Sequence, residues 1–596
     1  MTSGEPLVAD FAGCSGRAVP GGPRSGVPQH GPHGRNEPNG PQGPYGYRVM
    51  EIGARNGLPR AGCCAFQWLR PGVLEGLPQP VPDCFLLLSG PLPRRRSSSA
   101  DFVERIVRAA EFPQTFTDLL AQLPAELSGC VVTPERVVIF RGLTSPDQIF
   151  FRRSRAGVEW SSDPRDLLDG RFPEFDRETL WRSCRGEDVF VYPGLGRLRS
   201  GQLVAFDPEA TWTQQYERTT PMALPRRTTL REYARLTYDL LLDETRPYAG
   251  CGDRRVGILL SGGVDSATVL AALVDHGADV IAYHMGTDDP SADESGYARQ
   301  VCRHLRVPLV TVERASEDED YFSTGADFPH PFNHVWLRSL ERVADRVAAD
   351  GVHILTSGLE GDMLFGPLRY GLHDIVAGDV RRREKLRMLQ GLLATRWELS
   401  RILRSARPSY SLYADQAALD EVELGSDFLI PHPDAAPETD DLDYAPQEQT
   451  LNLGLWRPRG IHLAKPWGGR DLRRLAARIP DAYRLIPYGG RTIDKPVLRL
   501  AASHRLPPDV WRHYGRTWLG SPDENWCLRH AEVLARILGG PDTRLTALGI
   551  VDPVRIHEVL ADPRALRRNA ENLLCSAMVE LFLRDLEGKT GHAPRR

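Results

Sequence analysis

The stretch ILLSGGVDS, residues 258–266, decides the fold that the sequence predicts. An apolar run with the character of a β-strand leads directly into Ser-Gly-Gly and then into a predicted helix. Such a turn gathers backbone N–H groups and hydroxyls at a helix N-terminus, which favours anions. The glycines allow close approach of a ligand to the backbone. A Walker A loop is excluded because its lysine is missing.

Strands and helices alternate around this stretch. We expect strands at 256–260, 280–285, 308–313 and 352–356, and helices at 229–242, 267–276, 292–305 and 335–349. Alternation with elements of this length is typical of βαβ units, and therefore of a parallel sheet with helices on both faces. From Asp374 onward the pattern is mostly helical, apart from a loop-rich break at 432–447.

A second loop motif, TSGLEGDMLFG at 356–366, directly follows the last of these predicted strands. In open α/β sheets ligands bind beyond the carboxyl ends of the strands, so we expect Asp265 of the first loop and Asp362 of the second to lie together. Two carboxylates suit Mg²⁺, which takes few protein ligands alongside phosphate oxygens. A third patch, TIDKPVLRLA at 492–501, offers Lys495, whose ammonium could offset charge on a departing pyrophosphate.

Together these patches resemble the asparagine synthetase superfamily. SGGVDS is similar to the pyrophosphate loop of ATP pyrophosphatases, SGLEGDMLFG to the SGxGxDxLFG segment, and the lysine patch to a K-x-x-LR-x-A signature. The acidic segment between the loops, GTDDPSADESGYA at 286–298, resembles the DExxYA helix start, although Asp293 and Glu294 could equally serve only to favour a helix N-terminus.

The resemblance implies cofactors and roles for named residues. ATP would be cleaved between its α- and β-phosphates, with Mg²⁺ held by Asp265 and Asp362. Lys495, Glu360 and Asp362 would be catalytic, with Glu360 a candidate base for the attacking amine. The implied ATP contacts are Leu260, Ser261, Gly262, Gly263, Asp265, Ser266, Met285, Ser357 and Gly358.

The N-terminal half has a different character. Residues 19–46 are rich in Gly, Pro, Asn, Gln and His, and we expect residues 1–80 to form a disordered or poorly ordered tail. Strands are expected at 84–89, 131–141, 148–153 and 157–161, a helical pattern at 100–123, a short helix entry at 163–168, and a turn with a strand within 193–207. The domain at 81–215 is therefore expected to be mainly β, and the domain at 216–596 is expected to begin with a linker at 217–228.

Segment 141–168 resembles the glutaminase stretch of asparagine synthetases. That glutaminase uses an N-terminal cysteine as its nucleophile. There is no N-terminal Met-Cys-Gly here, and Cys63 and Cys64 are not in that context. The expected fold is a degenerate glutaminase-like (Ntn-type) α+β domain, followed by an ATP-pyrophosphatase-type parallel-sheet synthetase domain with a helical C-terminal part. The first domain should release no ammonia.

The degenerate N-terminal half makes the chain most similar to lasso peptide cyclases. The resemblance implies that an Asp or Glu side chain of a core peptide is adenylated and closed onto the peptide's own N-terminal amine. A precursor peptide, a leader peptidase and a leader-binding protein would be its partners. A small-molecule amide or β-lactam synthetase is the alternative, although Leu359 stands where β-lactam synthetases carry a Tyr.

Composition excludes other classes. The 596 residues predict two or three domains, and a net charge of −4 gives no case for binding nucleic acid or a membrane. No apolar run approaches the roughly 20 residues of a membrane span, and the first ten residues do not read as a signal peptide. The ten scattered cysteines lack a zinc or CxxC spacing, so we expect reduced, mostly buried thiols and a cytoplasmic location. A tRNA-modifying pyrophosphatase would show paired cysteines and a basic face.

Overall fold

The computed structural model of the protein describes residues 85–89, 106, 109, 113–123, 125–132, 136–145, 148–154, 157–161, 163–168, 172–187, 189–207, 210–249, 255–286, 293–313, 330–331, 337–366, 380–394, 426–430, 451–488, 491–513 and 521–590. The chain forms two compact units. The first contains Met1–Asp169 and Gly194–Arg218, and the second contains Gly170–Pro193 and Thr219–Arg596.

Five parallel strands form the central sheet of the second unit, in the order β11-β10-β9-β12-β13. They are β9 (Val256–Leu259), β10 (Val280–Met285), β11 (Leu309–Val312), β12 (Ile354–Ser357) and β13 (His462–Ala464). The chain adds β10 and β11 on one side of β9 and then returns to add β12 on the other side. The strand order therefore reverses between β9 and β12, the kind of switch point at which open α/β sheets bind ligands.

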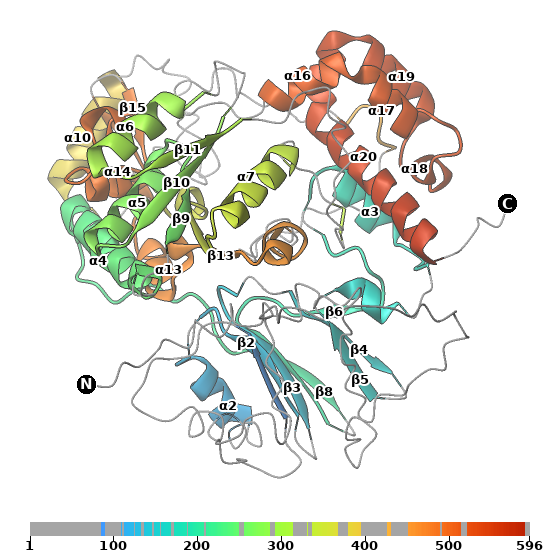
Figure 1. The fold of residues 1–596 in the computed structure, drawn as a ribbon, viewed down its shortest axis with the longest axis horizontal. Coiled ribbons are helices and arrows are strands. Elements are labelled where there is room, and N and C mark those ends of the chain that lie inside the picture. Colours follow the sequence, from blue (N-terminus) through green and yellow to red (C-terminus); the bar gives the residue numbers. More distant parts are fainter. Residues whose placement is uncertain are drawn as a thin grey trace, which may run out of the picture. The chain divides into compact units, whose positions relative to one another are not determined.

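Helices cover both faces of this sheet (Figure 1). The helices α5 (Val264–Asp275) and α6 (Ser295–Leu305) lie on one face, and α7 (Leu337–Ala349) lies on the other. The helix α4 (Leu230–Ala249) packs against α5. Because α5 starts where β9 ends, the N-terminus of α5 lies at the switch point.

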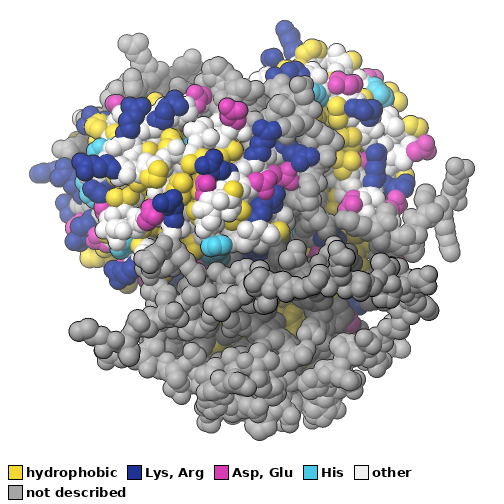
Figure 2. Space-filling model, viewed as in Figure 1, with side chains coloured by type: hydrophobic (Ala, Val, Ile, Leu, Met, Phe, Trp, Pro, Cys, Tyr) yellow, Lys and Arg dark blue, Asp and Glu magenta, His cyan; other side chains and the backbone are white. Residues whose placement is uncertain are grey.

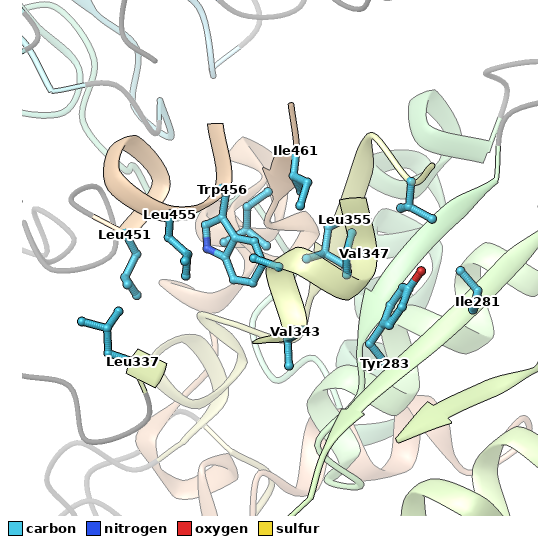
Figure 3. Packing of buried hydrophobic residues seen from close by; sticks show 13 residues of the cluster. Ile281, Tyr283, Leu337, Val343, Val347, Leu355, Leu451, Leu455, Trp456 and Ile461 are labelled. Carbon is cyan, nitrogen blue, oxygen red and sulfur yellow. The ribbon is translucent and has the colours of Figure 1, made fainter. Parts of the chain in front are cut away.

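The core under α7 is built from alternate residues of the strands (Figure 3). Ile281 and Tyr283 of β10 pack with Leu355 of β12 against Val347 of α7, and Trp456 of the π-helical turn η4 (Asn452–Trp456) joins them. Burying each such aliphatic side chain stabilises the fold by about 1.5–3 kcal/mol. This packing fixes the end of β12, from which the second loop motif departs.

The chain beyond β12 is mostly helical. Its helices are α8 (Gly361–Phe365), α10 (Arg382–Ala394), α13 (Arg470–Ala476), α14 (Pro496–Ala502), α15 (Pro508–Trp511), α16 (Ser521–Arg529), α17 (Ala531–Leu538), α18 (Arg544–Ala547), α19 (Pro553–Ala561) and α20 (Pro563–Thr590). The short turns η5 (Arg457–Arg459), η6 (Pro466–Gly468) and η7 (Asp481–Tyr483) and the hairpin β14 (Leu485–Tyr488) with β15 (Arg491–Asp494) lie between them. The long α20 packs against α16, α17, α19 and α3 (Arg177–Cys184).

The described residues of the first unit form two antiparallel sheets and include the helix α2. One sheet has the order β1-β2-β3-β7-β8 and the other β5-β4-β6. The elements are β1 (Phe85–Ser89), α2 (Pro113–Leu120), β2 (Ser128–Val132), β3 (Val137–Arg141), β4 (Phe150–Ser154), β5 (Gly157–Ser161), β6 (Gly196–Arg197), β7 (Gln202–Phe206) and β8 (Thr211–Gln215), with a 3-10 turn η2 (Pro164–Leu167). Alternation along β3 builds both cores: Val138 and Phe140 pack with α2, whereas Val137 and Ile139 pack with Val158 of β5.

The prediction of a mixed α/β fold with a parallel sheet is confirmed. A single strand over 131–141 was wrong, because β2 ends at Val132 and β3 begins at Val137, and the two pair with each other. The sequence reading also missed β13, which adds a fifth strand to the parallel sheet. The expected tail at 1–80 lies outside the described residues. The Ntn-type character of the first unit stays a prediction.

Candidate functional site

The loop after β9 is held by its own hydroxyls. Ser261 Oγ lies 3.1 Å from Ser266 Oγ and accepts a 3.1 Å hydrogen bond from the N–H of Gly263. Gly262 has a φ of +104°, and a Cβ there would lie 2.7 Å from the carbonyl oxygen of Glu294. Gly263 is the N-cap of α5 and supplies no side-chain hydrogen bond, so the first turn of α5 keeps its affinity for an anion.

The loop after β12 packs directly on the loop after β9. A Cβ at Gly358 would lie 2.5 Å from the backbone nitrogen of Ser266, and a Cβ at Gly361 would lie 2.2 Å from Asp265 Oδ1. Real Cβ atoms do not approach other atoms this closely, so only glycine fits at both positions. The two loop motifs therefore form one site at the switch point.

A lysine from the third patch lies between two carboxylates in this site. Lys495 Nζ donates a 2.5 Å hydrogen bond to Asp265 Oδ2 and forms a 2.6 Å ion pair with Asp362 Oδ1. Lys495 is the N-cap of α14 and has a left-handed backbone with a φ of +49°, which is uncommon for a residue with a side chain. Its side chain is 6% exposed and that of Asp362 is 64% exposed, so this buried cation is paired with a carboxylate that faces solvent.

Burial and charge act against each other on this cluster. Burial raises the pKa of Asp265, and the neighbouring Lys495 only partly offsets this effect. Burial alone would lower the pKa of Lys495, but attraction to Asp265 and Asp362 outweighs it and raises that pKa. Lys495 is therefore charged at neutral pH.

The chemistry of the donors fits a magnesium ion. Asp265 and Asp362 already converge on one cationic group, and Asp265 Oδ1 is buried and accepts no hydrogen bond from the residues that the structure describes. Mg²⁺ is typically bound by one or two carboxylates together with phosphate oxygens and waters. Asp265 and Asp362 are the residues that would hold it.

A segment that the sequence reading missed contacts both loops. Trp467, fully buried in η6, donates from Nε1 to the carbonyl oxygen of Asp265 at 3.3 Å. Its ring packs edge-to-face on Phe365 of α8, with 5.3 Å between the ring centroids. The segment leaves β13, the neighbour of β12, and so arrives beside the second loop. One sequence feature could have pointed to this segment: a Trp, a residue type that is usually largely buried, in the stretch PWGG that begins at Pro466.

Glu360, the predicted base, forms a buried ion pair. Its Oε2 accepts a 2.5 Å hydrogen bond from Arg473 Nη2, and the two side chains are 5% and 9% exposed. Arg473 Nε also donates to the carbonyl oxygen of Gly468 at 3.0 Å. A role of Glu360 as base stays a prediction, and this ion pair was not foreseen from the sequence.

The other predicted ATP contacts lie at the ends of neighbouring strands. Leu260 is buried directly after β9, and its N–H donates to the carbonyl oxygen of Tyr283 at 2.8 Å. Ser357 is buried at the end of β12. Met285 ends β10 and packs against the core under α7.

Two further polar side chains near the motifs have structural partners. Asp293 accepts a 2.9 Å hydrogen bond from the N–H of Ser295 at the start of α6, which lowers the pKa of its carboxyl and fits the helix N-terminus interpretation. Arg499 forms a buried 2.7 Å ion pair with Asp494.

A doubly wound parallel sheet with a glycine-rich loop and paired carboxylates at its switch point is the arrangement in which open α/β folds commonly bind ligands. The chain belongs to the asparagine synthase family, because the family model described as "Asparagine synthase" matches residues 241–584. That match contains both loops, Lys495 and the η6–α13 segment. The domain indicates an ATP-dependent ligase that forms amide bonds.

One curated protein is similar over part of the chain. It is "Microcin J25-processing protein McjC" from Escherichia coli, with 21% identity over 175 residues. The similar region covers 29% of this chain and 32% of the relative, so the chain spans about a third of the length of the curated relative it matches.

Two solved structures are similar at low scores. Glutamine phosphoribosylpyrophosphate amidotransferase from B. subtilis, complexed with ADP and GMP, has 9% identity and a TM-score of 0.17, covering 39% of this chain and 71% of that chain. The U34-tRNA thiolase NcsA from Methanococcus maripaludis, with its [4Fe-4S] cluster, has 13% identity and a TM-score of 0.20, covering 50% and 86%. Likenesses at these scores carry no argument about function.

The structure describes part of the surface and half of the cysteines. On the face in Figure 2, Lys and Arg side chains are mixed with Asp and Glu side chains over the coloured surface. The five described cysteines, namely Cys130, Cys184, Cys302, Cys527 and Cys575, are buried thiols. Burial raises the pKa of the Cys302 thiol to about 11. No helix within the described ranges has the length and apolar character to cross a membrane.

Proposed function

We propose that the chain is an ATP-dependent macrolactam synthetase of the lasso peptide cyclase type. It adenylates an Asp or Glu side chain of a core peptide and joins it to the N-terminal amine of the same peptide. The observation that carries the proposal is the ammonium of Lys495, shared by Asp265 and Asp362 at the carboxyl ends of β9 and β12. This group of charges lies where a triphosphate would meet the N-terminus of α5.

In the first step, a carboxylate oxygen of the substrate attacks the α-phosphorus of ATP. The bond from this phosphorus to the bridging oxygen breaks, and pyrophosphate leaves. The N–H groups of α5 and the hydroxyls of Ser261 and Ser266 bind the phosphate oxygens, and Lys495 offsets the charge that grows on the leaving group. Mg²⁺, held by Asp265 and Asp362, would supply further neutralisation of the phosphates.

In the second step, the amine nitrogen attacks the carbonyl carbon of the adenylate. The bond from carbon to the phosphate oxygen breaks, AMP leaves, and the amine gives up a proton to a base. The protein holds the two reacting ends together, which raises their effective concentration, and keeps water from hydrolysing the mixed anhydride.

The source of the amine follows from the expected N-terminal domain. A degenerate glutaminase-like domain at 81–215 releases no ammonia, so the substrate itself supplies the amine and glutamine is neither hydrolysed nor required. The partial similarity to a microcin-processing protein supports a peptide substrate. The pathway partners would be a leader peptidase and a leader-binding protein, and the setting would be the cytoplasm.

The second candidate is a small-molecule amide or β-lactam synthetase of the same family. Leu359, in the loop after β12, is 37% exposed and offers an apolar side chain beside the site. It carries no group that could accept a proton, which favours the peptide substrate over β-lactam closure.

The test is a panel of linear peptides, each with a free N-terminal amine and one Asp or Glu side chain, incubated with ATP and Mg²⁺. The proposal predicts a product lighter by one water, formed together with AMP. Matched peptides that are N-acetylated, or that carry Asn or Gln in place of the acid, should give no such product. Formation of AMP with a small amino-acid-like carboxylate, and with none of the peptides, would favour the alternative.

A further inference from the structure

Glu360 has a backbone conformation that its own side chain disfavours. It has a φ of +73° as the N-cap of α8, in the left-handed region where glycine is the usual residue. Gly358 and Gly361, which flank it, are glycines because nothing larger fits. A strained residue of this kind persists only where its surroundings require it, so the Glu360 side chain must have a task that glycine could not perform.

The Glu360 side chain is buried and forms an ion pair inside the protein. Its carboxylate pairs with Arg473, and Gly468 leaves it room, because a Cβ at Gly468 would lie 3.1 Å from both carboxylate oxygens. An ion pair buried in this way is costly to break, since either charge alone would be left without compensation. A carboxylate held like this is poorly placed to collect a proton from an attacking amine.

The pair belongs to a connected set of contacts that reaches Asp265 and Asp362, the two carboxylates paired with Lys495. Arg473 fixes the carbonyl of Gly468. The preceding residue, Trp467, holds the carbonyl of Asp265. Asp362 lies in the first turn of α8, two positions after Glu360, so the anchored N-cap sets where Asp362 is presented.

We propose that Glu360 and Arg473 act as a positioning pair that fixes Asp362 relative to Asp265, and that Glu360 is not the base for the amine. The inference rests on the proposed function and assigns roles within its site. Loss of the pair should therefore impair adenylate formation itself, together with every later step.

The test is a double-mutant cycle with Glu360→Gln, Arg473→Gln and the double variant, read by carboxylate-dependent exchange of labelled pyrophosphate into ATP. Each single variant should lose exchange by about 10²-fold or more, the scale of one lost transition-state contact. The double variant should exchange pyrophosphate at least as fast as the less active of the two single variants, because the two residues act as a unit. Arg473→Lys keeps the charge and should recover part of the exchange.

Two further variants separate positioning from a general loss of structure. Glu360→Gly relieves the strained backbone and should melt no earlier than Glu360→Gln, yet exchange should stay low. Glu341→Gln removes an equally buried carboxylate that pairs with Arg338 in α7, at 2.9 Å, and should keep full exchange.

Normal exchange without amide product in Glu360→Gln would overturn the inference and make Glu360 the base. Normal exchange and normal product would also overturn it. If the wild type gave no exchange, the proposed function would fail. The positioning role of Glu360 and Arg473 would then be tested by the binding of ATP with Mg²⁺. The rise in melting temperature on adding ATP with Mg²⁺ should be lost in both single variants, and its retention would count against the pair.

Discussion

Lys495 Nζ donates to Asp265 Oδ2 at 2.5 Å, although the two residues are 230 positions apart in the sequence. This contact connects the N-terminus of α14 to the first turn of α5. A second contact from the same ammonium, to Asp362, adds the loop after β12. One buried cation thus brings together all three motifs that the sequence offers, and its removal should affect each of them.

Asp265→Asn and Asp362→Asn should each lower pyrophosphate exchange by about 10²–10³-fold, because each removes a carboxylate that would hold Mg²⁺ at the phosphates. Their effects on stability should differ. Asp265→Asn leaves the buried Lys495 with less compensation and should cost about 3–5 kcal/mol of unfolding free energy. Asp362 is mostly exposed, so its substitution should cost about 1 kcal/mol or less. Denaturant unfolding measures the difference, and equal costs would contradict the asymmetric burial.

Lys495→Met should lose exchange by about 10²-fold or more, because no cation then offsets charge on the leaving pyrophosphate. It also leaves two carboxylates facing one another without the ammonium. Mg²⁺ without nucleotide should therefore raise the melting temperature of Lys495→Met more than that of the wild type. A thermal melt with and without MgCl₂ makes this comparison, and an equal response in the two proteins would argue against a shared cation position.

Trp467→Phe should keep the packing on Phe365 but lose the hydrogen bond to the Asp265 carbonyl, costing about 1 kcal/mol of unfolding free energy. Trp467→Ala removes a fully buried ring and should cost about 3–5 kcal/mol. Because the indole also positions Asp265, the KM for ATP should rise in Trp467→Phe. An unchanged KM would limit Trp467 to a packing role.

Gly358→Ala should abolish exchange, because its methyl group would press on the backbone nitrogen of Ser266 and separate the two loops. Gly296→Ala in α6 is the matched control. Its Cβ would meet no atom within 4 Å, and alanine should stabilise the helix by about 0.5–1 kcal/mol. The rate of pyrophosphate exchange is measured for both variants. A fully active Gly358→Ala protein would show that the reaction does not require contact between the two loops.

The parallel sheet was predictable because its strands are short apolar runs separated by helical patterns. The strands β9, β10 and β12 and the helices α5, α6 and α7 begin and end within a few residues of their expected bounds, whereas α4 continues to Ala249, beyond its expected end at 242. β13 was missed because its three residues, His462–Ala464, carry too short a pattern. The single strand expected over 131–141 is two strands, β2 and β3. The prediction counted Thr133 and Pro134 as part of one continuous strand.

The meeting of Asp265 and Asp362 was expected from the rule that loops gather at the carboxyl ends of parallel strands. Lys495 was assigned to the same site only through the resemblance of its patch to the family's lysine signature. The pairing of Glu360 with Arg473 could not be predicted in this way. Arg473 belongs to α13 and carries no motif, and only the three-dimensional path of the chain after β13 brings it to the second loop. The left-handed backbone at Glu360 is likewise invisible in a sequence where glycine would be the expected residue.

The most direct test of the central claim is the identity of the products formed from ATP. Phosphorus NMR on a complete reaction, with the purified chain, Mg²⁺ and a peptide that supports turnover, distinguishes the alternatives. AMP and pyrophosphate are expected in equal amounts, and their formation should depend on the substrate carboxylate. ADP and inorganic phosphate as the main products would contradict the central claim, because the carboxylate would then be activated as an acyl phosphate.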